Sequence, residues 1–127
     1  MDGRAYLDTH LLVWLRDGEL HKISPRMKAL IEEKDLYFSE FVRLELQYLF
    51  EIGKLTEPAN EIVMYLSVKA GIQSCTLSLP RIIQAALSLR WTRDPFDRLI
   101  TANASLLNAP LLTCDQTILE NYTYGVC

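Results

Sequence analysis

Short apolar segments alternate with longer segments of helical period along the whole chain, and this alternation limits the folds open to it. The expected strands are residues 4–8, 36–39, 72–77 and 110–114. The segment between the second and third of them, residues 41–52, has helical period and stops at Gly53, a typical C-terminal signal. Strands that alternate with helices favour a parallel sheet covered on both faces. The sequence therefore predicts an α/β fold.

Most of the other helices are also marked by residues that start or stop them. Ser24-Pro25 predicts a helix that runs to about Glu33, because serine caps a helix well and proline suits its first position. Asp94-Pro95 repeats the signal and predicts a helix to about Leu107. The remaining expected helices are residues 58–70, which stop at Gly71, residues 80–89 and a short one at 117–121.

Composition agrees with a single domain over residues 1–127. Half of the residues are apolar and the net charge is −3, so disorder is not expected. No apolar run approaches the roughly 18 residues that span a bilayer, and Asp8 comes too early for a signal peptide. We therefore expect a cytoplasmic protein without a membrane partner.

The three cysteines, Cys75, Cys114 and Cys127, are an odd number without Cys-x-x-Cys spacing. This pattern argues against a disulfide scaffold or a zinc site, and we expect reduced thiols. The mild acidity gives no general signal for nucleic-acid binding, because domains that bind phosphate by charge alone are normally basic. Evidence for a nuclease has to come from a local site.

Two acids stand where an expected strand stops. Asp8 follows Ala5-Tyr6-Leu7, and Asp115 follows Leu111-Leu112-Thr113-Cys114. Ligand sites in parallel sheets lie at the carboxyl ends of the strands. The alternatives are structural: Asp8 can belong to a plain turn, and Asp115 can cap the short helix that follows it.

Glu45 lies nearly opposite the polar stripe of its expected helix. Its helical neighbours are all apolar: Phe41, Leu44, Tyr48 and Leu49. A carboxylate in a core-facing stripe is unfavourable unless a cation meets it. Glu45 is therefore part of a buried salt bridge, or extends to solvent at the edge of the core, or is a ligand of a metal ion.

Asp97 and Asp94 open the helix after residue 93. An acid in the first turn, such as Asp97, is favoured by the helix dipole whatever its role. Asp94 is a natural N-cap, or a partner of Arg98, or a direct participant in a site. Four acids gathered at one sheet edge would repel one another unless a divalent cation bound them. Carboxylates suit Mg²⁺ or Mn²⁺, which can activate water for attack on a phosphodiester.

Four segments resemble successive motifs of PIN-domain ribonucleases, in particular VapC-type toxins of type II toxin–antitoxin systems. They are Leu7-Asp8-Thr9-His10, then Ser39 with Glu45 and Gly53-Lys54-Leu55, then Arg93-Asp94-Pro95-Phe96-Asp97-Arg98-Leu99-Ile100, then Leu112-Thr113-Cys114-Asp115. The resemblance covers about residues 5–120, and its most specific piece is residues 93–98. It implies a three-layer αβα domain with a central parallel sheet. It also implies a Mg²⁺- or Mn²⁺-dependent endoribonuclease that forms a homodimer and binds a cognate antitoxin.

The same resemblance assigns the site. Its catalytic and metal-binding acids are Asp8, Glu45, Asp97 and Asp115, with Asp94, Thr9 and Thr113 as auxiliary residues. The nearest basic cluster comprises Arg90, Arg93 and Arg98, which either form a solvated face or steer RNA phosphates to the site. The sequence departs from the family's pattern in two places. Around Glu45 it reads Arg-Leu-Glu-Leu, where many relatives place an aromatic residue before the acid, and its tail leaves room for only a short last strand.

Two histidines, His10 and His21, are too few and too scattered for a catalytic histidine pair, and structural roles are expected for both. Hydrolysis by metal-activated water, leaving a 5′-phosphate and a 3′-hydroxyl, is therefore predicted. A phosphatase or receiver-like phosphoryl-transfer protein is disfavoured, because His10 stands where the phosphatase needs a second aspartate and residues 113–115 lack the receiver's lysine. A nuclease-inactive binding module of the same fold stays open.

The expected helices at residues 41–52 and 58–70 carry more apolar residues than one core face needs. Phe50, Met64 and Tyr65 are examples. We expect part of this surface to seat an antitoxin segment and the rest to serve a homodimer.

Overall fold

The computed structural model describes residues 3–127, which contain a five-stranded sheet in the order β3-β2-β1-β4-β5. All neighbouring strands are parallel, which confirms the predicted α/β class. The first strand along the chain, β1, is thus the middle strand of the sheet. The strands are β1 (Arg4–Leu7), β2 (Asp35–Phe38), β3 (Gln73–Ser74), β4 (Leu111–Leu112) and β5 (Gly125–Val126).

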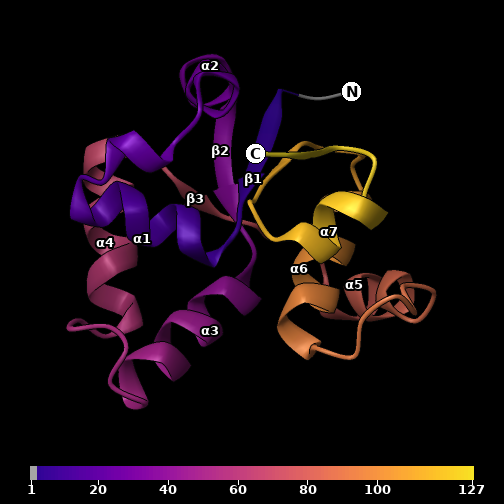
Figure 1. The fold of residues 1–127 in the computed structure, drawn as a ribbon. Helices are drawn as coiled ribbons and strands as arrows, with labels where there is room; N and C mark the ends of the chain where they lie inside the picture. Colours follow the sequence, from indigo (N-terminus) through magenta and orange to yellow (C-terminus); the bar gives the residue numbers. More distant parts are fainter. Residues whose placement is uncertain (1–2) are drawn as a thin grey trace.

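Helices connect the strands and pack on one another around the sheet (Figure 1). Helix α1 packs on α4, α3 packs on both α4 and α6, and α5 packs on α6. A short 3₁₀ turn at Leu20–Lys22 follows α1. The helices are α1 (Thr9–Asp17), α2 (Pro25–Glu33), α3 (Glu40–Glu51), α4 (Ala59–Ala70), α5 (Leu79–Ala86), α6 (Pro95–Ser105) and α7 (Gln116–Asn121).

The sequence signals for helix starts and stops are confirmed. The Ser24 hydroxyl accepts a hydrogen bond from the Met27 amide at 3.2 Å, so α2 begins at Pro25 as predicted. Gly71 ends α4 with a φ of 65°, a conformation that glycine adopts without strain. The predicted ends of α5 and α6 lie two or three residues too far along the chain, within the usual uncertainty of helix ends.

The third and fourth strands are shorter than predicted. Strand β3 is confined to Gln73 and Ser74 of the expected segment 72–77, although the Cys75 amide continues the ladder by donating to the Phe38 carbonyl at 2.9 Å. Strand β4 is confined to Leu111–Leu112, although the Thr113 amide continues the ladder by donating to the Val126 carbonyl at 2.9 Å. The tail forms β5, the short last strand that its length allowed.

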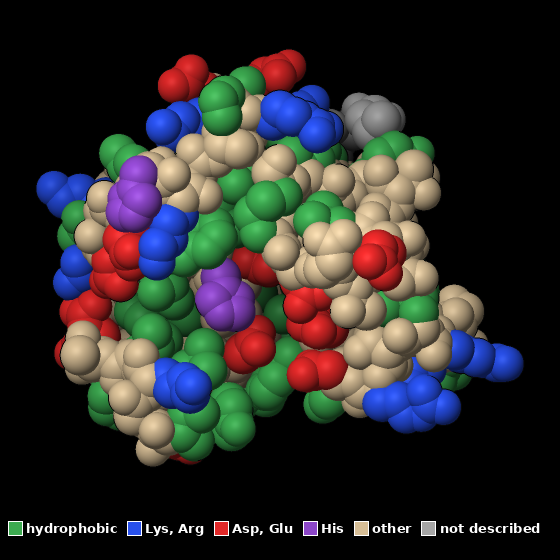
Figure 2. Space-filling model, viewed as in Figure 1, with side chains coloured by type: hydrophobic (Ala, Val, Ile, Leu, Met, Phe, Trp, Pro, Cys, Tyr) green, Lys and Arg blue, Asp and Glu red, His purple; other side chains and the backbone are tan. Residues whose placement is uncertain are grey.

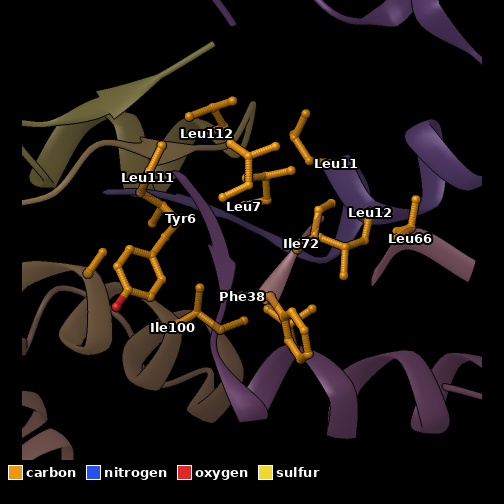
Figure 3. Close-up of a cluster of buried hydrophobic side chains, with 14 of the residues drawn as sticks. Tyr6, Leu7, Leu11, Leu12, Phe38, Leu66, Ile72, Ile100, Leu111 and Leu112 are labelled. Atoms are coloured by element: carbon orange, nitrogen blue, oxygen red, sulfur yellow. The ribbon is translucent and has the colours of Figure 1, made fainter. Parts of the chain in front are cut away.

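The core covers both faces of β1. Tyr6 and Leu7 point to opposite faces and are both buried. Figure 3 shows Tyr6 directed towards Ile100 of α6, whereas Leu7 lies beside Leu11 of α1. Helices therefore lie on both sides of the sheet, as the strand–helix alternation predicted.

The expectation of three reduced thiols is wrong for two of the cysteines. Cys114 and Cys127 form a disulfide, and only Cys75 is a free, buried thiol. The cause is the pairing of β5 with β4, which brings the residue after β5 to a Cα–Cα distance of 4.8 Å from Cys114. Cysteine spacing along the chain carries no information about which strands pair. No helix within residues 3–127 is long and apolar enough to cross a membrane.

Candidate active site

The strand order reverses between β1 and β4, and this is where an open α/β sheet forms a crevice at its carboxyl edge. Leu7 pairs with Leu112, and the Asp8 amide donates to the Leu112 carbonyl at 3.0 Å. The residues that follow the two strands are therefore neighbours, although about a hundred positions separate them. Asp8 and Asp115, the two acids predicted at strand ends, flank this crevice.

Asp8 is held firmly at the end of β1. Only 6% of the residue is exposed, and its carboxylate accepts hydrogen bonds from the Leu11 amide at 3.2 Å and from the Thr113 hydroxyl. The first bond caps α1, so the acid and the helix start are one structural unit. Burial raises the pKa of Asp8 above its usual value, and the bond from Thr113 opposes that rise.

Glu45 reaches the crevice from α3. Its carboxylate accepts a hydrogen bond from the Thr9 hydroxyl, so a threonine and not a basic residue meets this acid. Burial raises the pKa of Glu45, the Thr9 bond lowers it, and the charges of Asp8 and Asp94 raise it further. The proposed buried salt bridge is therefore not what holds Glu45.

The predicted surroundings of Glu45 need correction. Leu44 and Tyr48 are 58% and 49% exposed, so they do not belong to a core-facing stripe. The buried side of α3 is formed by Val42 and Leu46. Glu45 lies between these two groups, at the border of the buried side, because α3 packs on α4 and α6 with only part of its apolar surface. That border position is what allows the carboxylate to face the crevice.

Asp97 experiences the charges of the other acids. Burial, as the largest cause, and the charges of Asp115, Asp94, Glu45 and Asp8 together raise its pKa from 3.8 to about 7. Five carboxylates supplied by β1, β4, α3 and the start of α6 thus share one electrostatic field. The other four carboxylates are therefore near enough to Asp97 to affect its ionisation.

Asp94 and Asp115 both cap helices. The Asp94 carboxylate accepts from the Phe96 and Asp97 amides at 2.9 and 3.1 Å, and Asp115 accepts from the Ile118 amide at 2.9 Å. The structural alternatives proposed for these two acids therefore hold, and both acids still lie beside Asp97.

Arg98 does not bond Asp94. Its guanidinium donates to the carbonyls of Ala86 and Leu87 at 2.8 and 3.3 Å, which ties the end of α5 to α6. Arg90 and Arg93 are exposed. In Figure 2, basic side chains gather over the α5 side of this face, apart from the acidic side chains.

A cavity of about 240 Å³ opens beside the acids and is lined by Asp8, His10, Trp14, Cys114 and Asp115. Figure 2 shows acidic side chains around a hollow in this face, with a histidine next to them. His10 lines the cavity, and its charge lowers the pKa of both Asp8 and Glu45. The sequence predicted a structural role for His10 and no role for Trp14. His10 and Trp14 are four residues apart, a spacing that places them on one face of a helix, but residues 9–17 were not predicted as a helix.

The donor set fits Mg²⁺ or Mn²⁺ in its chemistry, because it consists of carboxylate oxygens. In the part of the chain that the structure describes, no three His, Cys, Asp or Glu side chains form a ready-made group that could hold a metal ion. The carboxylates are instead bonded to threonine hydroxyls and backbone amides. The raised pKa of Asp97 shows the repulsion that a divalent cation would relieve.

The sequence model of the PIN domain family matches residues 5–122. Two solved structures resemble the fold over 97% of this chain and 96% of theirs. One is VapBC2 from Rickettsia felis bound to a DNA fragment from its promoter, with 17% identity and a TM-score of 0.67. The other is a toxin–antitoxin complex from Klebsiella pneumoniae, with 19% identity and a TM-score of 0.66. No curated protein matches the chain significantly.

Proposed function

Because this chain belongs to the PIN-domain family, we propose that it is a Mg²⁺- or Mn²⁺-dependent endoribonuclease, the toxin component of a VapBC-type toxin–antitoxin pair. The observation that carries the proposal is the set of carboxylates around Asp97, at the point where the sheet order reverses. No basic side chain is bonded to Asp8 or Glu45 among residues 3–127, so their charge is available to a cation.

We assign the metal to Asp8, Glu45, Asp97 and Asp115. When bound there, the ion supplies an activated water and offsets negative charge on the scissile phosphate. Thr9 and Thr113 are positioning residues, because each donates its hydroxyl proton to one of these carboxylates and favours the ionised form. Asp94 fixes the first turn of α6 and so sets the place of Asp97.

Arg90 and Arg93 are the proposed phosphate contacts, since both are exposed on the loop before α6. Arg98 keeps a smaller part in RNA binding, because its guanidinium already bonds two backbone carbonyls. We call Asp97 and the four carboxylates around it the acid set. Because the arginine side chains lie to the side of the acid set, they can attract RNA without neutralising the carboxylates.

The antitoxin site is assigned to the exposed apolar side of α3 and α4. On α3 the exposed residues Leu44, Tyr48 and Ile52 recur every four positions and so share one face; on α4 the exposed residues are Met64, Tyr65 and Val68. The Tyr48 ring lies 6.2 Å from the Phe96 ring, next to Asp97, so this surface reaches the acid set. It fits a segment that combines apolar side chains with one basic side chain placed among the carboxylates.

We assign a homodimer to a second apolar face, instead of to the rest of the α3 and α4 surface expected from the sequence. Leu79 and Ile83 of α5 and Leu87, its C-cap, form this face; they are exposed and again four residues apart. The test is the oligomeric state in solution: Ile83→Lys should yield monomers, whereas Met64→Lys should not. A monomeric wild-type protein would contradict this part of the proposal.

The main test is RNA cleavage. Total RNA is incubated with the purified protein in Mg²⁺, Mn²⁺ or excess EDTA, and the new ends are sequenced. We expect cleavage only with the metal, with 5′-phosphate and 3′-hydroxyl ends. Glu45→Gln should abolish cleavage, whereas Glu32→Gln, a matched change at an exposed acid on α2, should not.

Two results would refute the proposed reaction: cyclic phosphate ends, or full cleavage in EDTA. RNA binding with no cleavage under any metal condition would favour the alternative, a nuclease-inactive PIN-fold binding module.

A further inference from the structure

Two aromatic side chains and a lysine lie along one rim of the cavity that contains Asp8 and Asp115. We call them the His10–Trp14–Lys22 strip. His10 and Trp14 line the cavity itself, and the Lys22 ammonium lies 5.9 Å from the centroid of the Trp14 ring. The strip therefore runs outward from the carboxylates, along α1 and onto the turn that follows it.

The fold fixes the strip relative to the acids. Asp8 caps α1, so His10 and Trp14 stand one helical turn apart on the side of α1 that faces the cavity. Their ring centroids are 6.5 Å apart, with an angle of 49° between the ring planes. A rigid helix thus holds two aromatic surfaces at a set distance from the proposed metal ligands.

Contacts within the protein do not use the whole surface of these three side chains. His10 is exposed, and its imidazole makes no hydrogen bond within residues 3–127. Trp14 packs partly against the core but remains half-buried at the cavity. Lys22 pairs with Glu19 at 2.7 Å, but both side chains are about a third or more exposed. Such an exposed pair is weak enough to exchange for a phosphate.

We propose that the His10–Trp14–Lys22 strip binds a nucleotide of single-stranded RNA beside the acid set. The base stacks on the Trp14 ring and contacts His10 beside it, and Lys22 contacts a phosphate. Aromatic rings combined with nearby cations are how proteins hold single strands without sequence preference. A base inside a duplex has both faces covered by its neighbours and cannot stack in this way. The inference rests on the proposed ribonuclease function and adds to it a base-binding site outside the acids.

The first test uses the fluorescence of Trp14. The chain has two tryptophans, so Trp91→Phe leaves Trp14 as the only one. The probe is a single-stranded RNA of about ten nucleotides in Ca²⁺, checked on a gel to be uncut. We expect RNA to quench Trp14, and Trp14→Ala to weaken binding roughly tenfold, a typical loss for one stacked base. Trp14→Phe should restore most of the affinity, because it keeps an aromatic face.

The control for an exposed aromatic residue is Tyr124→Ala. Tyr124 lines a different cavity, with Pro110, at the opposite end of β4 from the acids. This substitution should leave the Kd unchanged. A duplex of the same sequence should bind the unaltered protein at least tenfold more weakly than the single strand.

The second test separates stacking from a purely structural role of Trp14. An abasic nucleotide is placed at each position of the RNA in turn. At one position the abasic nucleotide should lower the affinity of the protein that contains Trp14. At the same position it should cause no further loss of affinity in Trp14→Ala. If Trp14 only supports the fold, Trp14→Ala will weaken all oligonucleotides equally and no position will show this coupling.

The outcomes distinguish the two proposals. If wild type cuts RNA with Mg²⁺ but Trp14→Ala binds and cuts as well as wild type, the strip is not a base site and the ribonuclease function stands. Equal binding of duplex and single strand overturns the inference in the same way. If wild type neither binds nor cuts RNA, both proposals fall.

Discussion

Asp97 has an environment unlike that of an ordinary surface acid. It lies in the first turn of α6, where a helix dipole favours negative charge, yet its pKa rises to about 7. Burial and four neighbouring carboxylates outweigh the dipole. The protein therefore maintains an unfavourable concentration of like charge at this point, which is the pattern expected of a functional site.

This environment predicts a pH dependence of stability in the metal-free protein. The Asp97 carboxyl ionises near pH 3.8 in the unfolded chain but near pH 7 in the folded one. Between these values the unfolded state binds fewer protons, so the free energy of unfolding falls as pH rises from about 4 to 7. Asp97→Asn should reduce this slope, and Asp17→Asn, at the exposed end of α1, should not. Denaturant titrations in EDTA at several pH values measure the free energy of unfolding and so give its slope against pH. Identical slopes in wild type, Asp97→Asn and Asp17→Asn would contradict the raised pKa of Asp97.

Bound Mg²⁺ should reverse this fall in the free energy of unfolding with rising pH. The ligands bind a cation in their ionised form, so Mg²⁺ should stabilise the protein more at pH 7.5 than at pH 5.5. The thermal midpoint with and without Mg²⁺ gives this difference. A midpoint shift that is as large in Asp97→Asn as in wild type would place the metal elsewhere.

At the scale of elements, the site is built from helix starts. Asp8, Asp94 and Asp115 cap α1, α6 and α7, and each also lies in or beside the acid set. Capping points the first amides of each helix at a carboxylate, which partly offsets the repulsion among the acids. The proposed functional role therefore coincides with a structural one at these positions, and a substitution has to be chosen to separate them.

Asp94 allows this separation. Asparagine caps a helix about as well as aspartate, so Asp94→Asn should keep its stability and lose only part of its activity. Asp94→Ala loses both capping bonds and should be less stable by roughly 0.5–2 kcal/mol. Asp97→Asn should fold normally and be inactive. Cleavage rates at saturating Mg²⁺ and thermal midpoints test all three; an inactive Asp94→Asn beside an active Asp97→Asn would show that the metal ligand was misassigned.

At the scale of the whole molecule, the strand order determines what meets at the crevice. Strand β4 lies beside β1, and β5 lies beside β4, so the end of the chain reaches the residue next to Asp115. The Cys114–Cys127 disulfide closes this edge of the sheet. Cys114 also lines the cavity beside Asp8, so the covalent link adjoins the candidate site.

Reduction of the disulfide should weaken the fold. Its sequence separation is 13 residues, and the chain-entropy model assigns about 3 kcal/mol to a loop of roughly this size. Dithiothreitol should lower the denaturant midpoint of wild type, whereas the midpoint of Cys127→Ser should be lower from the start and insensitive to the reagent. A wild-type midpoint unaffected by complete reduction would show that the bond adds nothing to stability.

The sequence alone was enough to establish the fold class and the starts of α2 and α6, and it predicted which acids form the site. These features are local: Ser24-Pro25 and Asp94-Pro95 act through their own backbone, and apolar alternation predicts strands wherever it occurs. The parallel sheet covered on both faces follows from that alternation, and the motifs indicate the family.

The contacts between these helices, strands and acids became known only from the tertiary structure. The Thr9–Glu45 and Thr113–Asp8 bonds, the disulfide and the place of His10 and Trp14 at the cavity depend on which strands pair and how α3 packs. The same long-range packing exposed Leu44 and Tyr48, which a helical wheel assigned to the core. A wheel locates an apolar stripe but not the width of the surface that covers it, and here α4 and α6 cover only part of α3.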